Sequence, residues 1–467
     1  MAGSYSECGS EKEHQILETK QQDATDMDSE KAHIPSTLDK KLATETTTPV
    51  TAPPPLQDGG TRAWLQVLGS FLVFANLWGF TFAFGSFQSY YELTYLVGTS
   101  ASSISWIGTV TVFLLICIGI ISGPLFDLGY FRTMLLVGAA METLSVFLMS
   151  VCDKYWHFML AQGILQGLGN GLLYLPGLAL VGRSFKKNRA IAMGVTTCGA
   201  PVGGVIYTLV FEQLISKTSF GWTVRIMGFV MLGSYLISFP LLLWGAKNIG
   251  DLASGAPRKL FDRTALTNAP FWAYSTSNFL IFCGYMIPFY FIPSYGELVL
   301  GISRSLSLYV AMIAQASSIL SRLIAGYSAS RIGVLIPWII CAACSGAVSI
   351  AWIGAHSLGG FIAIAALYGC FSGALIPLPP SVFPVVCPDP KVFGTRLGMA
   401  QAIGSVASLI GAPIGAALAA VSSHGGDTNY LGLQLFGGLI MLAGAGNLAL
   451  LWWVLARRRE AGSSVLI

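Results

Sequence analysis

Two ionisable residues lie in the middle of long apolar stretches, and they are the strongest candidates for chemistry. Arg322 keeps its positive charge at any accessible pH, and a charge at such depth usually faces a partner or a water-filled cavity. We expect Arg322 to face a cavity and contact an anionic group, with a buried structural partner as the alternative. Glu142 either titrates and couples protons or bonds a neighbouring helix. We favour the second role because the third helix of two-bundle folds is commonly peripheral.

A second set of side chains has the composition of a solute-binding pocket, because polar and aromatic residues lie on stretches expected to line the centre of the protein. Such a pocket recognises a partly apolar, oxygen-bearing molecule through a few polar groups in mostly apolar surroundings. For each residue, packing in the core is an equally good alternative. The predicted substrate-binding residues are Ser86, Asn170, Tyr174, Asn278, Tyr285 and Arg322, and Asn76, Gln88 and Tyr290 belong to the same polar and aromatic set.

The residue patterns typical of enzymes are missing from the sequence. It has no GxxxxGK[ST] phosphate-binding loop and no HExxH motif. The five histidines lie in the N-terminal segment or near the ends of apolar stretches, too scattered for a metal cluster. We therefore predict no enzymatic activity, no catalytic residues, no metal and no cofactor.

The elements that must position these residues are membrane-spanning helices. Hydrophobic residues make up 54% of the 467 residues and charged residues only 10%, whereas soluble domains carry about 25% charged residues. Apolar stretches of about twenty residues, the length that crosses a bilayer as a helix, recur twelve times. The sequence predicts an all-α integral membrane protein with transmembrane helices at 63–90, 104–123, 131–151, 156–182, 189–211, 223–246, 270–294, 304–329, 334–354, 358–386, 396–421 and 430–456.

The distribution of charge predicts how the chain is organised. Residues 1–60 carry a net charge of −6 and are rich in Ser and Thr, so we expect a disordered cytoplasmic tail. A polar cytoplasmic linker at 247–269 separates six-helix bundles at 61–246 and 270–456, and a cytoplasmic tail follows at 457–467. With both termini in the cytoplasm, sixteen basic residues fall on the cytoplasmic side and four on the other side, as the positive-inside rule requires.

The two halves repeat short motifs in the same order. Gly167-x-x-x-Gly171 corresponds to Gly369-x-x-x-Gly373, and Gly199-Ala-Pro-Val-Gly203 corresponds to Gly411-Ala-Pro-Ile-Gly415, at offsets of 202 and 212 residues. Small residues four apart let helix backbones approach closely, and the proline in each second motif should bend its helix. The repeats predict a six-helix unit duplicated in tandem, as expected of two bundles that rock about a central site.

Three further motifs lie at the ends of predicted helices. They are Gly123-x-Leu-x-Asp127 with Arg132, Asp58-Gly59-Gly60-x-x-Ala63-Trp64, and the segment from Ser184 to Ala190 that contains Lys186, Lys187 and Arg189. Together they resemble the major facilitator superfamily, and more specifically the fungal branch of its monocarboxylate transporter (monocarboxylate porter) family. The resemblance implies a two-bundle fold with alternating access. It also assigns Asp127 and Arg132 to a cytoplasmic gate, and Arg322 to the substrate site. We expect Gly123, Lys186, Lys187 and Arg189 to belong to the same gate.

Two positions differ from the proton-coupled animal members of that family. Ser86 stands where those proteins carry a Lys in the first helix, and Ser318 stands where they carry an Asp one turn before Arg322. The resemblance therefore favours the varied cargo of the fungal relatives over animal-type transport of lactate or pyruvate.

These observations predict a secondary active transporter that moves a small organic solute by alternating access, either a monocarboxylate-like anion or a secondary metabolite for efflux. Its expected partners are this solute, the lipid bilayer and, as an option, a coupling proton, but no nucleic acid. We expect a monomer in the plasma membrane, with the vacuolar membrane as the alternative location. The alternative function is a non-transporting nutrient sensor that signals through residues 1–60.

Overall fold

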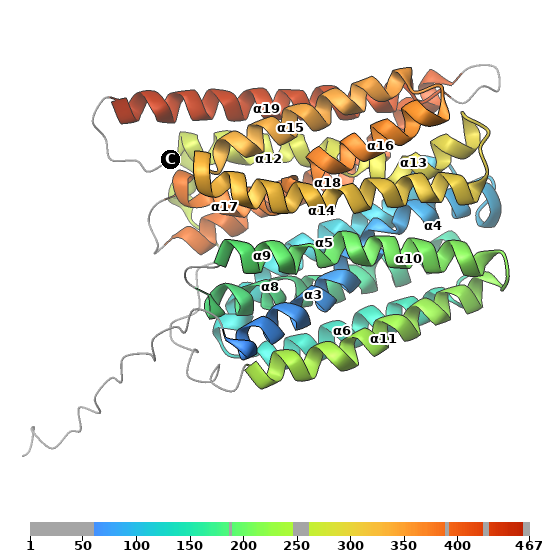
Figure 1. Ribbon diagram of the computed structural model, residues 1–467, viewed down its shortest axis with the longest axis horizontal. Helices are drawn as coiled ribbons and strands as arrows, with labels where there is room; N and C mark the ends of the chain where they lie inside the picture. The colour runs from blue at the N-terminus through green and yellow to red at the C-terminus, as the bar shows by residue number, and fades with distance from the viewer. Residues whose placement is uncertain (1–59, 186–188, 246–260, 388–391, 424–428, 461–467) are drawn as a thin grey trace, which may run out of the picture. The chain divides into compact units, whose positions relative to one another are not determined.

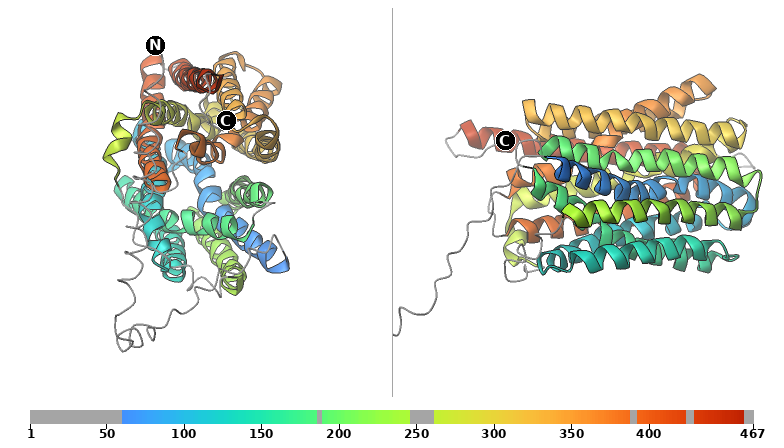
Figure 2. Two further views of the ribbon diagram at one scale, coloured as in Figure 1. Left: turned by 90° about the vertical axis from the view of Figure 1, so that its left-hand side faces the viewer. Right: turned by 60° about the horizontal axis from the view of Figure 1, so that its bottom comes forward.

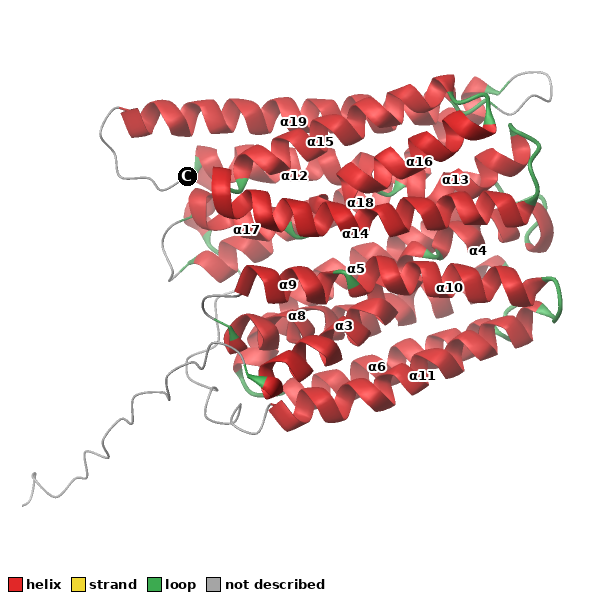
Figure 3. Cartoon of the chain, in the orientation of Figure 1, coloured by secondary structure: helices red, strands yellow, loops and turns green. Residues whose placement is uncertain are grey.

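The computed structural model describes residues 60–185, 189–245, 261–387, 392–423 and 429–460, which all belong to the unit from Leu56 to Ile467. Twelve helical spans in these ranges are long and apolar enough to cross a membrane, and Figure 3 shows helices joined by short loops. The predicted all-α membrane protein with twelve transmembrane helices is thereby confirmed. The predicted N-terminal tail lies outside the described residues, as do most of the linker and of the C-terminal tail.

The first six spans form the N-terminal half. Its elements are α3 (Thr61–Phe82), α4 (Phe84–Tyr90), η1 (Tyr91–Tyr95), α5 (Ala101–Asp127), α6 (Phe131–Met149), α7 (Tyr155–Phe158), η2 (Met159–Leu165), α8 (Gln166–Ser184), α9 (Arg189–Thr197), α10 (Gly199–Ile215) and α11 (Phe220–Gly245).

The last six spans form the C-terminal half. Its elements are η4 (Arg263–Thr267), α12 (Ala269–Tyr285), α13 (Ile287–Leu298), α14 (Arg304–Ile332), α15 (Leu335–Ala351), η5 (Trp352–Gly354), α16 (Leu358–Ser372), η6 (Gly373–Leu375), α17 (Leu378–Val386), α18 (Phe393–Ser422) and α19 (Leu431–Glu460). The helices of both halves run along one common direction, as Figure 1 and the end-on view on the left of Figure 2 show.

Because the helices share one direction, the protein has two faces at their ends. We call the end where α3 begins at Thr61 the Thr61 face, and the end where η1 finishes at Tyr95 the Tyr95 face. Four helix pairs join the two halves: α5 with α18, α10 with α14, α4 with α13, and α9 with α14.

Several predicted helix ends fall short of the observed ones. The sequence places the end of the first helix at 90, but a π-helical turn continues it to Tyr95. The helices predicted to end at 123, 211, 294 and 456 continue to Asp127, Ile215, Leu298 and Glu460. The prediction ends each helix where its apolar stretch ends. The observed helix continues further because its backbone N–H and C=O groups pair with one another whatever the side chains are.

Both halves interrupt their first helix at the same place. The break between α3 and α4 falls at Ala83 and the break between α12 and α13 falls at Met286, 203 residues later. The same offset relates Gly98 to Gly301, which both have positive φ, a conformation that glycine adopts without a steric penalty. The repeat predicted from the motifs therefore extends to the backbone conformation.

The repeated glycines make equivalent backbone contacts in the two halves. A Cβ atom at Gly199 of α10 would lie 2.1 Å from the Phe71 carbonyl oxygen of α3, and one at Gly411 of α18, its counterpart in the repeated motif, would lie 2.0 Å from the Cys283 carbonyl oxygen of α12. The glycines of the other repeated motif likewise pack α8 on α5 and α16 on α14. Because no larger residue fits at these distances, the duplicated motifs fix the same helix pairs twice.

The repeated prolines have different consequences for their helices. The helix that contains Pro201 is interrupted at Cys198, between α9 and α10, whereas α18 stays continuous through Pro413. A proline has no N–H to donate to the carbonyl four residues before it. In the N-terminal half this leaves the Thr197 carbonyl without its helical donor, at the point where α9 ends.

Candidate functional site

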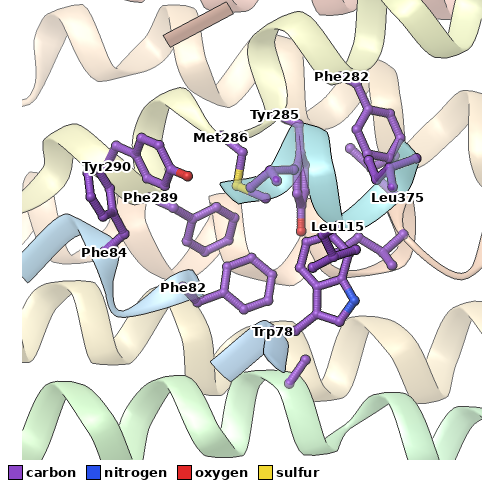
Figure 4. Packing of buried hydrophobic residues seen from close by; sticks show 14 of the residues in the cluster. Trp78, Phe82, Phe84, Leu115, Phe282, Tyr285, Met286, Phe289, Tyr290 and Leu375 are labelled. Carbon is purple, nitrogen blue, oxygen red and sulfur yellow. The ribbon is translucent and has the colours of Figure 1, made fainter. Parts of the chain in front are cut away.

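Aromatic side chains fill the middle of the interface between the two halves. Ring centroids lie 5.2 Å apart for Phe82 and Phe289, 4.8 Å for Phe84 and Tyr290, and 5.7 Å for Tyr285 and Phe289. Figure 4 shows these rings approaching one another from the two chain segments that flank the helix breaks. The breaks at Ala83 and Met286 thus bring α4 and α13 together, and a Cβ at Gly85 would lie only 2.2 Å from the Phe289 carbonyl oxygen.

Arg322 of α14 contacts this aromatic cluster, and its side chain is buried with only 2% of its surface exposed. Its guanidinium carbon lies 6.0 Å from the centroid of the Phe82 ring, at the outer limit of a cation–π contact. Its Nη1 donates to the Thr197 carbonyl oxygen of α9 at 2.6 Å. Within the described ranges, its Nε and Nη2 have no hydrogen-bond partner and no carboxylate forms an ion pair with it.

The local sequence explains the single hydrogen bond that Arg322 makes. Pro201 removes the helical donor of the Thr197 carbonyl, so this buried oxygen needs another donor. The guanidinium supplies one from the other half of the protein. Since it carries five N–H groups in a planar fork, the donors on Nε and Nη2 are left for a ligand with anionic or carbonyl oxygens.

Two of the other predicted substrate-binding residues also lie where the halves meet. Tyr174 of α8 packs on Phe74 and Trp78, with ring centroids 6.0 and 6.2 Å apart. The Trp78 ring in turn stacks on Phe82, which meets Phe289 of the other half. Tyr285 is fully buried, and its hydroxyl has no hydrogen-bond partner among the residues that the structure describes. Arg322, Tyr174 and Tyr285 therefore gather at the interface.

The remaining predicted substrate-binding residues are buried elsewhere. Asn278 donates to Gln401 Oε1 at 3.3 Å inside the C-terminal half, and Asn170 donates to the Leu77 carbonyl at 3.3 Å inside the N-terminal half. Ser86 is buried in α4, one turn from the helix break. The polar set predicted as one pocket is thus divided between the interface and the interiors of the two halves in this conformation.

Glu142 of α6 lies fully buried inside the N-terminal half. The hydroxyl of Tyr235 of α11 donates to Glu142 Oε2, so the acid does bond a neighbouring helix. Asn76 of α3 continues the network, because it accepts from the Tyr207 hydroxyl of α10 at 2.8 Å and donates to Ser234 of α11 at 3.2 Å. Such buried networks must be satisfied throughout, and this one ties together helices far apart in the sequence.

Three amide side chains form a row at four-residue spacing on one face of the fourth span. Gln162, Gln166 and Asn170 are all buried, with at most 2% of their surface exposed. The hydroxyl of Tyr91 donates to Gln162 Oε1 at 3.0 Å near the Tyr95 face. Our sequence analysis missed the two glutamines, although spacing of i and i+4 places side chains on one helix face and was a usable signal.

Polar contacts join the two halves at the Tyr95 face. Ser89 donates to Glu297 Oε1, and Arg304 pairs with Glu297 at 3.3 Å and donates to Thr94 Oγ1 at 2.9 Å. Ser294 donates to Glu92 Oε2 at 3.2 Å. No pattern in the sequence predicts this cluster, because its residues lie about 200 positions apart. Its contacts join the two halves at the Tyr95 face.

The predicted gate residues that the structure describes belong to the Thr61 face. Gly123 lies in α5, where a Cβ would meet Leu175 at 3.1 Å, and Arg132 is exposed near the start of α6. Asp127 and Arg189 are described only as the end of α5 and the start of α9. Lys186 and Lys187 lie outside the described residues, so the gate they were predicted to form stays a prediction.

An ion pair at the Thr61 face involves Arg396, near the start of α18. Arg396 Nε donates to Asp262 Oδ2 at 2.7 Å, and its Nη2 donates to Thr264 Oγ1 at 2.9 Å. Hydrogen bonds from Thr264 and from Arg396 lower the pKa of Asp262 to about 2. The pair holds the segment before α12 against the start of α18.

Two cavities accompany these elements, and neither of them is lined by Arg322. A cavity of about 10 Å³ lies inside the N-terminal half and is lined by Phe80, Thr81, Phe84, Gly108, Thr111, Gln162 and Gln166. A hollow of about 460 Å³ lies between α6 and η2 near the Tyr95 face, lined mainly by apolar residues. At the interface, aromatic rings occupy the place where the sequence predicts a polar cavity.

Comparison with known proteins reveals one family. A profile described as Major Facilitator Superfamily matches residues 67–358. The chain is 36% identical to the aspyridones efflux protein apdF of Emericella nidulans over 84% of this chain and 77% of that protein. It is 35% identical to the agnestins efflux protein AgnL12 of Paecilomyces divaricatus over 84% and 88% of the two chains, and 34% identical to the MFS-type transporter dbaD of Emericella nidulans over 82% and 85%.

Proposed function

The chain belongs to the major facilitator superfamily of membrane transporters, and we propose that it exports a small, partly apolar metabolite that carries an anionic or strongly polar group. Relatives named as efflux proteins for aspyridones and agnestins support the direction and the chemical class. The resemblance of its loop motifs to fungal monocarboxylate porters supports an anionic group on the cargo.

Arg322 is the observation that carries this proposal. It is a buried cation at the interface between the halves, its Nε and Nη2 are without partners in the described ranges, and the Phe82 ring lies 6.0 Å from its guanidinium carbon. A carboxylate or enolate of the cargo would accept from these donors in the bidentate manner that guanidinium favours. Tyr174 and Tyr285 would supply aromatic faces and hydroxyl groups to the rest of the molecule.

Alternating access follows from the way the two halves are joined. The contacts at the Tyr95 face are few, polar and partly exposed, so they separate at little cost. We infer that the halves rock about the interface, that the Thr61 face is cytoplasmic in the plasma membrane, and that Asp127, Arg132, Lys186, Lys187 and Arg189 close it when the Tyr95 face opens. The basic residues gathered at the Thr61 face support this orientation.

The test is to delete the gene in the organism that carries the chain and to profile medium and cells by mass spectrometry. The exported metabolite should fall in the medium and rise in the cells, and the wild-type gene should restore its export. Arg322→Ala should restore less than about a tenth of it, since losing a buried charged hydrogen bond costs about 1.4 kcal/mol or more. The matched control is Arg225→Ala, which removes a cation that donates to Ser150 near the Tyr95 face.

Two results would contradict the proposal in different ways. Unchanged profiles after deletion would argue against export altogether. Full restoration by Arg322→Ala, at wild-type protein levels in the membrane, would leave export standing but remove Arg322 from the substrate site.

A further inference from the structure

Glu142 is an acid in surroundings that are unsuited to a carboxylate. Its side chain has no exposed surface, and the ion pairs and hydrogen bonds of the described residues include none between Glu142 and a Lys, Arg or His. The groups that face it are the hydroxyl of Tyr235 from α11 and the amide of Asn170 from α8. Tyr207 of α10 is the other titratable group nearby, and it reaches the network through Asn76 of α3. A buried carboxylate without a cation is strongly disfavoured.

The amide of Asn170 lies beside this acid. In one orientation its Nδ2 donates to the Leu77 carbonyl at 3.3 Å, and its oxygen then faces two other oxygens, Glu142 Oε1 and the Gln166 carbonyl. In the reversed orientation Nδ2 lies 3.3 Å from Glu142 Oε1 and 3.2 Å from the Gln166 carbonyl and can donate to both. A carboxyl oxygen accepts such a bond in the protonated acid as well as in the carboxylate, so the bound proton is favoured by the burial of Glu142 without a cation among the described residues rather than by the amide.

A row of buried polar groups leads to this acid from beneath the Tyr95 face, where Tyr91 of η1 is itself fully buried. It starts at Tyr91, continues through Gln162, and reaches the cavity of about 10 Å³ that both Gln162 and Gln166 line. That volume is about the minimum for one water molecule. Both polar atoms of the Gln166 side chain are buried and have no partner among the described residues, so a water in the cavity would satisfy them. Asn170 follows one turn further along the fourth span, beside Glu142.

We propose that Glu142 is a proton-binding site, reached from the Tyr95 face through Gln162, the water-sized cavity, Gln166 and Asn170. The site holds a proton while the helices around it are packed as described, and it releases the proton when that packing loosens. This inference rests on the proposed function only where it makes the bound proton the coupling ion of transport. The binding of the proton itself can be measured without any cargo.

The first experiment uses infrared spectroscopy on the purified full chain in lipid nanodiscs at pH 7. The wild-type protein minus the Glu142→Gln variant should show a protonated carboxyl C=O band, because Gln keeps the shape and hydrogen-bonding capacity of a protonated Glu. The Ser345→Ala variant, at the equivalent position of the other half, should keep the band. If the difference spectrum shows a carboxylate band in place of the carboxyl band, Glu142 is ionised and the proposal is overturned.

The second experiment tests the route by exchanging the sample into D₂O. Deuterium shifts the carboxyl band, so the rate of the shift reports how fast protons reach Glu142. Gln166→Leu should slow that rate about tenfold or more, because it removes the polar groups of the cavity. Gln434→Leu changes a buried glutamine of the C-terminal half and should leave the rate unchanged. Equal rates in the wild type and Gln166→Leu would refute the route.

The third experiment asks whether the proton is coupled to transport. Export of the metabolite found by profiling is measured at external pH values one unit apart, across which the proton concentration changes about tenfold. Wild-type export should change with pH, and export by Glu142→Gln should not. If Glu142→Gln export still follows pH while the infrared band is lost, the proton site stands but its coupling role falls. If neither protein exports anything, the transport proposal fails and the infrared result is unaffected.

Discussion

The N-terminal and C-terminal halves share their backbone packing and differ in the charge that each buries. The offset of 203 residues that relates the breaks at Ala83 and Met286 also pairs Glu142 with Ser345 and Arg322 with Gly119. The N-terminal half therefore buries an acid where the other half has a serine. The C-terminal half buries a cation where the first has a glycine.

The position of each charge within its half differs as well. Glu142 lies inside a bundle, in hydrogen-bonding contact with α11. Arg322 lies at the interface between the bundles, bonded across it to Thr197. Close glycine contacts therefore constrain the helix packing of both copies of the repeat equally, whereas single polar positions can differ between the copies and serve different functions. We assign proton binding to the first and cargo binding to the second.

The shared packing is tested by adding one methyl group in each half. Gly199→Ala and Gly411→Ala, at equivalent positions of the repeated motif, place a Cβ 2.1 and 2.0 Å from backbone carbonyl oxygens. Each should therefore lower the free energy of unfolding by about 3 kcal/mol, measured as thermal unfolding of the purified protein. Gly233→Ala and Gly446→Ala, with nothing within 4 Å of the new atom, are the controls. A large loss in only one half would break the equivalence of the two copies.

The buried acid and its serine counterpart should respond differently to removal of their polar groups. Glu142→Ala leaves the Tyr235 hydroxyl without its acceptor and should destabilise the protein by about 2 kcal/mol. Ser345→Ala removes a buried hydroxyl that has no partner in the described ranges, so we expect a change below about 0.5 kcal/mol. Thermal unfolding at pH 7 measures both. Equal losses would mean that Ser345 has its own polar network.

The buried cation should affect transport much more than stability. Arg322→Met keeps the volume of the side chain and removes a charge with a single protein hydrogen bond. Removing a poorly paired buried charge also removes its desolvation cost, and this gain offsets the cost of about 1 kcal/mol or more of leaving the Thr197 carbonyl without its donor. We therefore expect a net change in unfolding free energy below about 1 kcal/mol and a loss of export. Destabilisation greater than that of Glu142→Ala would show that Arg322 is chiefly a structural residue.

The smallest effect concerns the ion pair of Asp262 and Arg396 at the Thr61 face. The pKa of Asp262 in the folded protein, about 2, lies below its ordinary value of about 4. The charged carboxyl therefore stabilises the folded protein above the ordinary value, and this contribution is lost as the pH falls toward 2. Asp262→Asn should slightly lower the unfolding temperature by the same amount at pH 7 and pH 5, with the exposed Arg263→Gln as the control. A difference that vanishes already at pH 5 would contradict the lowered pKa.

The class of protein, the number of spans, the repeat and the two buried charges could all be predicted from the amino-acid sequence. These depend on composition, on hydropathy over about twenty residues and on motif spacing, all of which are properties of a stretch of chain. Arg322 could be selected without a structure because a charge so deep in an apolar helix must have a specific reason. The same reasoning selected Glu142 but could not supply its partner, since nothing in the sequence links it to Tyr235.

The hydrogen-bond partners of the polar residues could be identified only from the tertiary structure. The sequence predicts Asn170 and Asn278 in one pocket. In the structure Asn170 donates to α3 within the N-terminal half, and Asn278 donates to α18 within the C-terminal half. The contacts at the Tyr95 face and the bond from Arg322 to Thr197 depend on where each helix is interrupted and how it is rotated about its axis. Helix breaks and rotations are set by close packing against other helices, and that information is distributed over the whole chain rather than held in any one segment of it.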